Sequence, residues 1–310
     1  MLPRPAIFRL PVAVTVLLLS SACGSAPAPP PRLYEPGELS PQDRQALVEA
    51  ERAYRIGAPD FDARRAALAG EPLTALWLTR LFVRDVLFVR ERRDPDQQQA
   101  FAAAAGHRDQ NEVRAIEQIV AIGGAAVPCL VEDLLKNRQT VPRELGVELL
   151  GRIGAPALAA LQPLLADSDV RLRRAAVRAT AAMPASATTL ERLRQSGKDR
   201  DFTVRAEALR GLAHGTDVDA VLLRQALAGD ADPFVRRVAA ESLAGHRDRA
   251  SAQALIDFLE RCSSGGERKG EAVAQASLQK LAGSGGPRTV AAWRTWLLEW
   301  REDPAARLRQ

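Results

Sequence analysis

The three histidines, His107, His214 and His246, are the residues of this chain best suited to acid–base or metal chemistry. A metal site needs several ligands that converge on one ion, and these three residues are far apart in the sequence. His107 and His246 each stand in the string Gly-His-Arg-Asp, which is typical of a turn that follows a helix. We therefore expect no metal site and no catalytic histidine.

The sequence motifs of common catalytic and cofactor sites do not occur in this chain. There is no Cys-x-x-Cys, His-Glu-x-x-His or Gly-x-Ser-x-Gly motif, and no phosphate-binding loop or dinucleotide fingerprint. Two glycine-rich stretches, residues 263–266 and 283–286, lack the preceding strand that a phosphate loop requires. They are typical of loops between helices. The sequence therefore predicts no catalytic residue and no cofactor.

Residues 1–22 are predicted to be a secretory signal peptide. Arg4 and Arg9 give this segment positive charge without an acid, and residues 10–19 form an apolar stretch. Small residues then precede Cys23, as they do at a cleavage site. The apolar stretch is too short to serve as a permanent membrane span.

The small residues before Cys23 resemble the lipobox of bacterial lipoproteins. In that family a dedicated peptidase cleaves before the cysteine, which carries a diacylglyceryl group, so the resemblance implies lipidation of Cys23. Ser20 stands where a lipobox usually has leucine, and Leu19 lies one position earlier. Ser20 and Ala22 also suit an ordinary signal peptidase, which leaves simple secretion as the alternative. Gly24 replaces the aspartate that retains lipoproteins in the inner membrane, which implies the outer membrane or cell surface.

A proline-rich segment, residues 23–41, follows the predicted cleavage site, with six prolines from Pro27 to Pro41. Proline cannot continue a helix, and such runs favour an extended polyproline II conformation at roughly 3 Å per residue. We expect a semi-rigid tether, long enough when extended to hold the folded part about 50 Å from a bilayer.

The formal charge of +5 comes from 43 basic residues, of which only 4 are lysine, and 38 acidic residues. Excess positive charge attracts the phosphates of nucleic acids. However, no dense basic run occurs, and acids are interspersed among the arginines. Removal of residues 1–22 takes away two arginines and no acid, which leaves +3 (5 − 2). Nucleic acid is therefore not an expected partner.

Three stretches of the chain repeat one sequence pattern. The structure that they form must be the framework on which any functional residues lie. They begin at Asp169, Asp201 and Asp232, with spacings of 32 and 31 residues. A period in this range with helical patterning predicts a stacked array of helical hairpins. Each aspartate is expected to cap the first helix of its hairpin, because its carboxylate accepts free backbone N–H groups. Each is followed four residues later by an arginine: Arg173, Arg205 and Arg236.

Three further units complete the array in the sequence. Two looser copies at residues 121–135 and 151–165 end in Leu-Leu pairs that are 30 residues apart (165 − 135). Gly124 and Gly154 are expected to end the first helix of each, because glycine adopts the left-handed conformation at little cost. An altered sixth unit is expected at about residues 267–301.

The patterns Asp-x-x-Val-Arg-x-x-Ala and Ile-Gly-x-x-Ala-Val-Pro-x-Leu resemble HEAT repeats of the short type found in phycobilin lyases. The resemblance covers about residues 108–302. It implies an all-α, right-handed solenoid of helical hairpins, preceded by a small helical N-terminal segment. It also implies an Asp–Arg ladder between neighbouring repeats, with a stripe that binds acidic groups on the concave face as the alternative. The ladder residues are Asp169, Asp201, Asp232, Arg173, Arg205 and Arg236.

The two remaining cysteines, Cys129 and Cys262, fall in repeats that should lie about four stacking steps apart, or roughly 40 Å. A disulfide requires Cα atoms within about 7 Å of each other. We therefore expect no bond between them and expect both to be small, buried, apolar residues.

Residues 42–107 do not fit the repeat and are predicted to form a helical capping region. The third predicted helix is the most apolar, but Arg80, Arg84 and Asp85 near its middle would make a membrane span costly. We expect it to be a buried helix packed on the first repeats, and adjacent Arg84 and Asp85 are not an obvious ion pair. The predicted helices are residues 42–56, 59–69 and 72–90.

Trp293, Trp296 and Trp300 are spaced i, i+3 and i+7, on one face of a predicted helix near the C-terminus. A repeat array must cover its last apolar face, so we interpret them as a terminal cap. An aromatic patch for a partner is the alternative. Residues 303–310 are predicted to be a C-terminal tail.

The sequence favours a non-catalytic, lipid-anchored HEAT-repeat scaffold that binds another protein in the bacterial cell envelope, with its membrane link through Cys23. Most members of the family it resembles are scaffolds or adaptors, while some attach bilin chromophores. One alternative is therefore a chromophore-handling enzyme, which rests on analogy of fold. Another is nucleic-acid binding, as in HEAT-like alkylpurine glycosylases, which the signal peptide argues against. The partner itself is not identified by the sequence.

Overall fold

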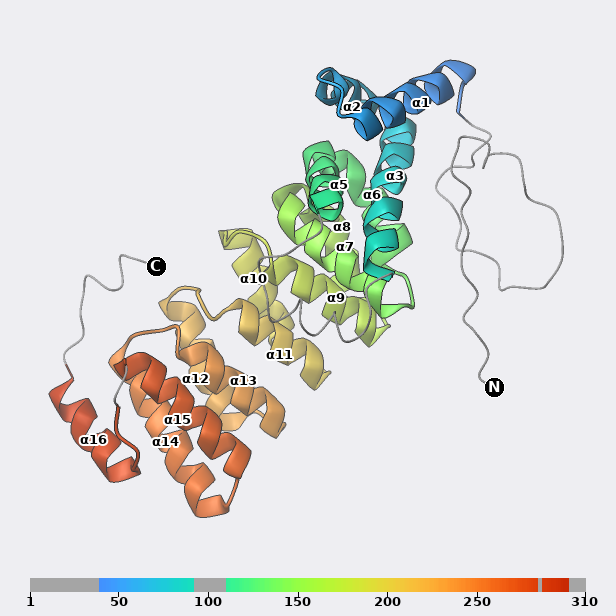
Figure 1. The fold of residues 1–310 in the computed structure, drawn as a ribbon. Helices are drawn as coiled ribbons and strands as arrows, with labels where there is room; N and C mark the ends of the chain where they lie inside the picture. The colour runs from blue at the N-terminus through green and yellow to red at the C-terminus, as the bar shows by residue number, and fades with distance from the viewer. Residues whose placement is uncertain (1–38, 92–109, 284–285, 301–310) are drawn as a thin grey trace, which may run out of the picture. The chain divides into compact units, whose positions relative to one another are not determined.

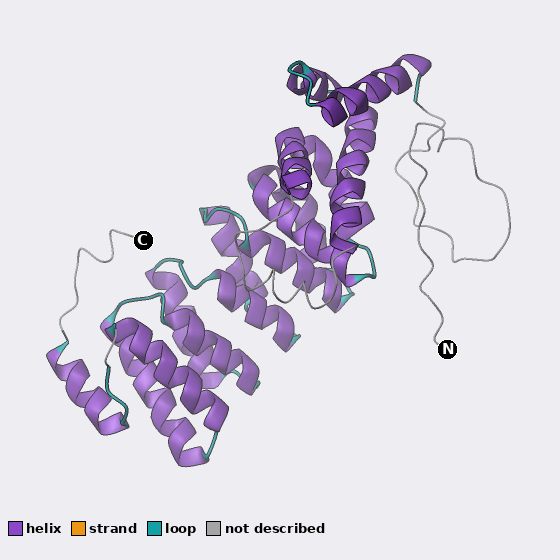
Figure 2. Cartoon of the chain, in the orientation of Figure 1, coloured by secondary structure: helices purple, strands orange, loops and turns teal. Residues whose placement is uncertain are grey.

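The computed structural model describes residues 39–91, 110–283 and 286–300, and the regular elements in these ranges are helices (Figures 1 and 2). The predicted signal peptide, Cys23, His107 and the tail at 303–310 lie outside the described residues. The expected all-α solenoid is confirmed. The chain divides into two compact units between Ala126 and Val127, and each unit is described by itself below.

The N-terminal unit is built from helices that surround an aromatic cluster. The ring centroid of Tyr54 lies 5.4 Å from that of Phe61 and 4.9 Å from that of Phe82. Ser40 caps the first helix by accepting a hydrogen bond from the backbone N–H of Asp43. The elements are α1 (Pro41–Ile56), α2 (Phe61–Ala69), α3 (Pro72–Glu91), α5 (Gln110–Ile122) and a 3₁₀ turn η3 (Gly123–Ala126).

The apolar helix α3 is buried in this unit. This agrees with the expectation that charged residues near its middle make a membrane span too costly. It packs against α5, which the sequence pattern had placed in the first repeat. Its two central charges pair with α1, since Arg84 lies 3.2 Å from Glu51 and Asp85 lies 2.8 Å from Arg55. Adjacent Arg84 and Asp85 are not an obvious ion pair in the sequence, yet Nη2 of Arg84 comes within 3.6 Å of Asp85, because both side chains turn toward α1.

The C-terminal unit is a row of helical hairpins (Figure 1). The first helices of successive hairpins, α7, α9, α11, α13 and α15, pack against one another in order, and α14 packs against both α12 and α16. The elements are α6 (Val127–Cys129), a π-helical turn η4 (Leu130–Leu135), α7 (Thr140–Ile153), η5 (Ala155–Ala157), α8 (Leu158–Leu165), α9 (Val170–Ala181), α10 (Ala187–Ser196), α11 (Phe202–Gly211), α12 (Asp217–Gly229), α13 (Pro233–Leu243), α14 (Arg249–Gly265), α15 (Arg268–Ala282) and α16 (Val290–Glu299).

The predicted caps and stops define the hairpins. Asp169, Asp201 and Asp232 each accept a hydrogen bond from a backbone N–H of the first turn of α9, α11 and α13. Gly154 ends α7 with φ +73°, as expected. In the earlier unit the left-handed residue is Gly123 (φ +67°), not Gly124, because α5 ends one residue sooner than the repeat pattern suggests.

Small residues let the first helices approach closely. A Cβ atom added to Gly211 in α11 would lie 2.7 Å from the Cβ of Ala181 in α9 and 2.8 Å from Cδ1 of Leu193. Ala208 and Ala239 lie fully buried in the same core. Because helices packed through small side chains leave no spare volume, the register between neighbouring repeats is fixed sterically.

One stretch in the described part of the chain, Gln110–Leu135, is long and apolar enough to cross a membrane by its length and composition. Half of its most apolar window is buried inside the protein. Ile116 and Ile119 are core residues of the N-terminal unit, and Leu130 and Leu134 are core residues of the C-terminal unit. Core helices of water-soluble proteins pass the same test of length and apolarity.

Candidate functional site

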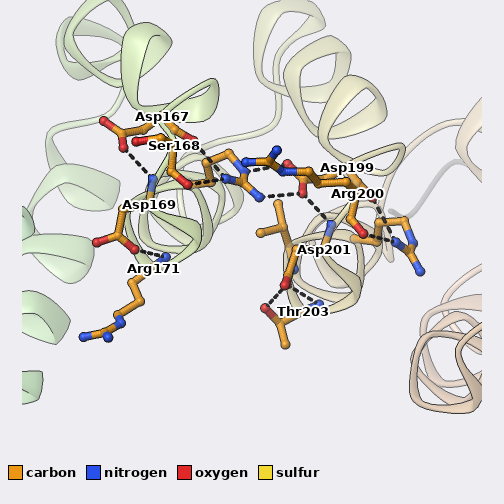
Figure 3. A network of polar contacts seen from close by, with 11 residues as sticks. Asp167, Ser168, Asp169, Arg171, Asp199, Arg200, Asp201 and Thr203 are labelled. Carbon is orange, nitrogen blue, oxygen red and sulfur yellow. Dashed lines mark hydrogen bonds and ion pairs between the residues drawn. The ribbon is translucent and has the colours of Figure 1, made fainter.

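Arg173 on α9 forms the first complete rung of a ladder between neighbouring repeats. It joins Asp167 and Ser168 to Asp199, and Figure 3 labels these three partners. Its Nε donates to Oδ2 of Asp199 at 2.8 Å, and its Nη2 donates to Oδ1 at 3.0 Å. Its Nη1 donates to the carbonyl oxygens of Asp167 and Ser168, at 2.8 and 3.2 Å. The guanidinium thus clamps the start of its own helix and the loop before the next one, in the bidentate geometry that arginine and carboxylate favour.

Arg205 on α11 repeats this arrangement one hairpin further along. Its Nε and Nη2 donate to the two carboxylate oxygens of Asp230, at 2.8 and 2.9 Å. Its Nη1 donates to the carbonyl oxygens of Asp199 and Arg200, at 2.9 and 3.2 Å. Both arginines therefore anchor one edge on the carbonyls five and six residues earlier and present the other edge to an acid of the next repeat.

The acids of the ladder are not the three capping aspartates that the sequence analysis grouped with it. They lie two residues earlier, at Asp199 and Asp230, and each also accepts the backbone N–H of the cap that follows, at 2.8 and 2.9 Å. The sequence nevertheless carries a signal for these two acids. The string Asp-x-Asp recurs at 167–169, 199–201 and 230–232, with the same spacing as the caps.

Burial makes these rungs electrostatically strong. The side chain of Arg173 is only 5% exposed and that of Asp199 12%. The hydrogen bonds with Asp199 raise the pKa of Arg173, against the opposing effect of burial. Burial alone would raise the pKa of Asp230, but hydrogen bonds from Arg205 and from the N–H of Asp232 outweigh it and hold that pKa below its usual value. Arg173 and Asp230 are therefore ionised over the physiological pH range.

The ladder is incomplete at Arg236 on α13. Its Nη1 donates to the carbonyls of Asp230 and Ala231, at 2.8 and 3.4 Å, as in the two earlier rungs. The nearest acid is Glu267, whose Oε2 lies 4.0 Å from Nη2 and whose Oε1 accepts a hydrogen bond from Arg237 at 3.0 Å. Within the described residues, the Nε of Arg236 donates no hydrogen bond.

A pocket of about 420 Å³ opens beside this unfinished rung. Arg261 borders it and donates to the carbonyls of Leu227 and Ala228 at 3.1 and 3.0 Å, at the end of α12. Burial and the charge of Glu267 raise the pKa of the Cys262 thiol to about 11, so the thiol is neutral at physiological pH. The lining residues are Ala228, Gly229, Asp230, Arg236, Phe258, Arg261, Cys262 and Glu267.

Further ion pairs join neighbouring repeats at positions outside the ladder. Arg194 on α10 donates to both oxygens of the fully buried Asp219 on α12, at 2.7 and 3.1 Å. Arg224 on α12 lies 3.2 Å from Asp248, which caps α14. These pairs, like the ladder, hold the repeats in register, and the repeat pattern of the sequence did not predict them.

The tryptophans at the C-terminal end form an aromatic stack on α16. Trp293 is fully buried, and its Nε1 donates to Oε1 of Gln275 on α15 at 3.0 Å. Trp296 contacts it edge to face at 5.2 Å and stacks on Trp300 at 5.1 Å, and these two rings are partly buried on the same core. Trp293 therefore belongs to the packing of the last hairpin, and only the outer two rings reach the surface.

The remaining chemically active side chains are dispersed. His246 is buried, with its Nε2 3.1 Å from the carbonyl oxygen of Leu212, while His214 is exposed. Cys129 and Cys262 are both buried, as expected. No group of three or more potential metal ligands occurs in the part of the chain that the structure describes.

Comparison with protein families identifies the repeat. No curated protein matches the chain. A family model of HEAT repeats matches it twice, over residues 127–213 and 190–275. Both matches fall in the C-terminal unit; the first contains the rung of Arg173 and Asp199, and the second contains the rung of Arg205 and Asp230. Residues 127–275 of this chain are therefore HEAT repeats.

Proposed function

We propose that this protein is a non-catalytic scaffold that binds another protein, and that lipid on Cys23 holds it at a membrane of the bacterial cell envelope. The observation that carries the proposal is the array of HEAT repeats over residues 127–275. Stacked repeats present a long continuous surface, which commonly serves to bind other proteins.

The electrostatics of the array support a structural use of its charges. Arg173 and Arg205 point along the array at Asp199 and Asp230, so their guanidinium groups join repeats to each other. A surface whose repeats are fixed in this way is preorganised, and preorganisation lowers the entropy cost of binding a partner.

The anchor rests on the N-terminal sequence. Two arginines, an apolar stretch and small residues before Cys23 support export and lipidation. The proline-rich stretch that follows supports a tether that keeps the array away from the bilayer. Gly24 after the cysteine favours the outer membrane or the cell surface over the inner membrane.

The anchor is tested by intact mass and detergent partitioning of the full chain expressed in a bacterial host. We expect cleavage before Cys23, a gain of lipid mass, and partitioning into detergent. Cys23→Ala should abolish the lipid mass and the partitioning, while the neighbouring Ser21→Ala, the matched control, should retain both. A chain that keeps residues 1–22 and stays in the aqueous phase would refute the anchor.

The scaffold role is tested separately by photo-crosslinking from the array in intact cells. A crosslinking amino acid at Phe202 or Val218, which are exposed on the repeats, should yield one adduct of defined mass. The adduct should disappear when the rung is broken by Asp230→Ala, and reappear when the pair is replaced by a different matched ion pair. A catalytic activity that depends on a single side chain would overturn the proposal.

A further inference from the structure

We propose that the pocket beside Arg236 binds a carboxylate group of a partner protein, which completes the ladder in place of an internal acid. The inference deepens the proposed scaffold function and rests on it, because it names the chemistry of the group that the scaffold takes. It is carried by the comparison of three equivalent arginines, of which two show how the site is used when filled.

The guanidinium of Arg236 is held in the same way as those of the filled rungs. In each case Nη1 donates to the carbonyls six and five residues earlier, at 2.8 and 3.2 Å for Arg173, 2.9 and 3.2 Å for Arg205, and 2.8 and 3.4 Å for Arg236. This leaves the edge formed by Nε and Nη2 free to face the next repeat. At Arg173 and Arg205 a carboxylate takes that edge with two hydrogen bonds.

The reason for the gap at Arg236 is visible in the sequence and in the length of α14. The ladder acids stand two residues before the caps of α11 and α13, and the corresponding position before the cap Glu267 is Gly265, which has no side chain. Helix α14 has 17 residues, against 10 in α10 and 13 in α12, so helix occupies the place of the loop that carries the acid. The edge of Arg236 faces the pocket instead.

The charges around the pocket favour an anion. The carboxylate of Asp230 is neutralised by Arg205, and that of Glu267 by Arg237. Arg236 and Arg261 then add two further positive charges, and the nearest acid to Arg236 is Glu267, whose Oε2 lies 4.0 Å from Nη2. Phe258 supplies an apolar wall, beside the neutral thiol of Cys262, which donates to Oε2 of Glu267 at 3.8 Å. A carboxylate on a short aliphatic stem would match both the positive edge of Arg236 and the apolar wall of the pocket. The filled rungs show that a carboxylate fits the Nε and Nη2 edge of an arginine.

The test is a titration of the full chain with small carboxylates, followed through the arginine Nε–Hε signals in nuclear magnetic resonance spectra. Arg236→Lys identifies the Arg236 signal by removing it. The probes are N-acetylglutamate α-amide, which carries a side-chain carboxylate, N-acetylalanine, which carries a C-terminal carboxylate, and inorganic phosphate. At about pH 6 both carboxylates are ionised.

We expect a saturable shift of the Arg236 signal by a carboxylate, with a Kd on the order of millimolar, and no shift of the Arg173 signal, whose edge is occupied. Whichever carboxylate binds more tightly identifies its source as an acidic side chain or a chain end. Arg236→Gln should weaken binding at least about tenfold. Arg224→Gln, which removes a charge with the same 24% exposure, should not. Glu267→Gln should tighten binding a few-fold, because it removes the competing acid.

Several results would overturn the inference. A signal that responds equally to every anion, or equally at Arg173 and Arg236, would show simple screening. Tighter binding of phosphate would exclude the carboxylate as the preferred group. An Arg236 signal already in the position of the Arg173 signal, and insensitive to every probe, would show that Glu267 closes the rung by itself. Because the probes are small molecules, these results do not depend on the lipid anchor or on the crosslinking test.

Discussion

Asp230 binds Arg205 through both carboxylate oxygens, at 2.8 and 2.9 Å, while its own carbonyl oxygen accepts a hydrogen bond from Arg236 at 2.8 Å. One residue therefore joins two successive arginines, one through its side chain and the other through its backbone. The same linkage passes through Asp199, which accepts from Arg173 and Arg205. Three repeats are coupled in series through these two aspartates.

Breaking the first rung should be costly because its arginine is buried. Asp199→Ala leaves the guanidinium of Arg173 without its carboxylate in a site where that side chain is 5% exposed. We expect the free energy of unfolding to fall by about 3 kcal/mol or more, measured by urea denaturation. Glu191→Ala, which removes an acid that is 57% exposed, is the control and should change it by less than about 0.5 kcal/mol. Equal effects would show that the rung contributes no special stability.

The buried aspartate Asp219 should make stability depend on acid pH. Burial acts to raise its pKa, but hydrogen bonds from Arg194 and Thr216 outweigh burial and hold the pKa below its usual value. A carboxyl whose folded pKa is lowered stabilises the fold fully above its unfolded pKa, about 3.9, and loses that contribution as pH falls toward the folded value.

In the natural chain, the urea concentration at the midpoint of unfolding should therefore decrease as pH decreases through this acid range. In Asp219→Asn the part of the slope due to this residue should be absent, together with part of the stability at neutral pH. An unchanged slope in the variant would show that other carboxyls, such as Asp201 and Asp230, account for the dependence.

The close approach of α9 and α11 predicts opposite effects for two glycine substitutions. Gly211→Ala places a Cβ 2.7 Å from that of Ala181, so we expect a loss of about 1–3 kcal/mol from overpacking. Gly229→Ala meets nothing within 4 Å at the end of α12 and should be neutral or stabilise by up to about 1 kcal/mol. Thermal denaturation of the two variants gives the comparison. A tolerated Gly211→Ala would mean that the two helices separate without cost.

The C-terminal tryptophans were interpreted as a terminal cap or as an aromatic patch for a partner. The two interpretations differ in which substitution should lower the stability of the array. Trp293 is fully buried and hydrogen-bonded to Gln275, so Trp293→Ala should cost about 3–5 kcal/mol and loosen the last hairpin. Trp300→Ala removes a partly buried ring and should cost less. Hydrogen exchange of the α15 and α16 amides reports the effect locally. A larger loss at Trp300 would contradict the role of Trp293 as the cap of the array.

The sequence predicts the fold well because its strongest signals are local. Asp169, Asp201 and Asp232 act on the turns beside them, and their period follows directly from the repeat. Helices α1 to α3 were also predicted to within a few residues, since Ser40, Gly57 and Gly70 mark their ends.

The ladder acids and the pocket were not predicted, because they depend on which loop meets which helix. Arg173 is 26 residues from Asp199, and only the stacking of α9 on α11 brings them together. The Asp-x-Asp strings would have suggested the acids. The gap at Arg236 follows from the extra length of α14 and from Gly265, which stands where the earlier repeats have the acid.

The uneven ladder also means that the array is not equally stiff along its length. Between α9 and α13 a bend must stretch two paired hydrogen bonds at each joint, those of Arg173 and Arg205. Between α13 and α15 the corresponding arginine has no such pair to stretch. Arg237 and Glu267, 3.0 Å apart, still join α13 to the start of α15. A ligand that bridged the open edge of Arg236 would add to this joint the restraint that Arg173 and Arg205 give the two earlier ones.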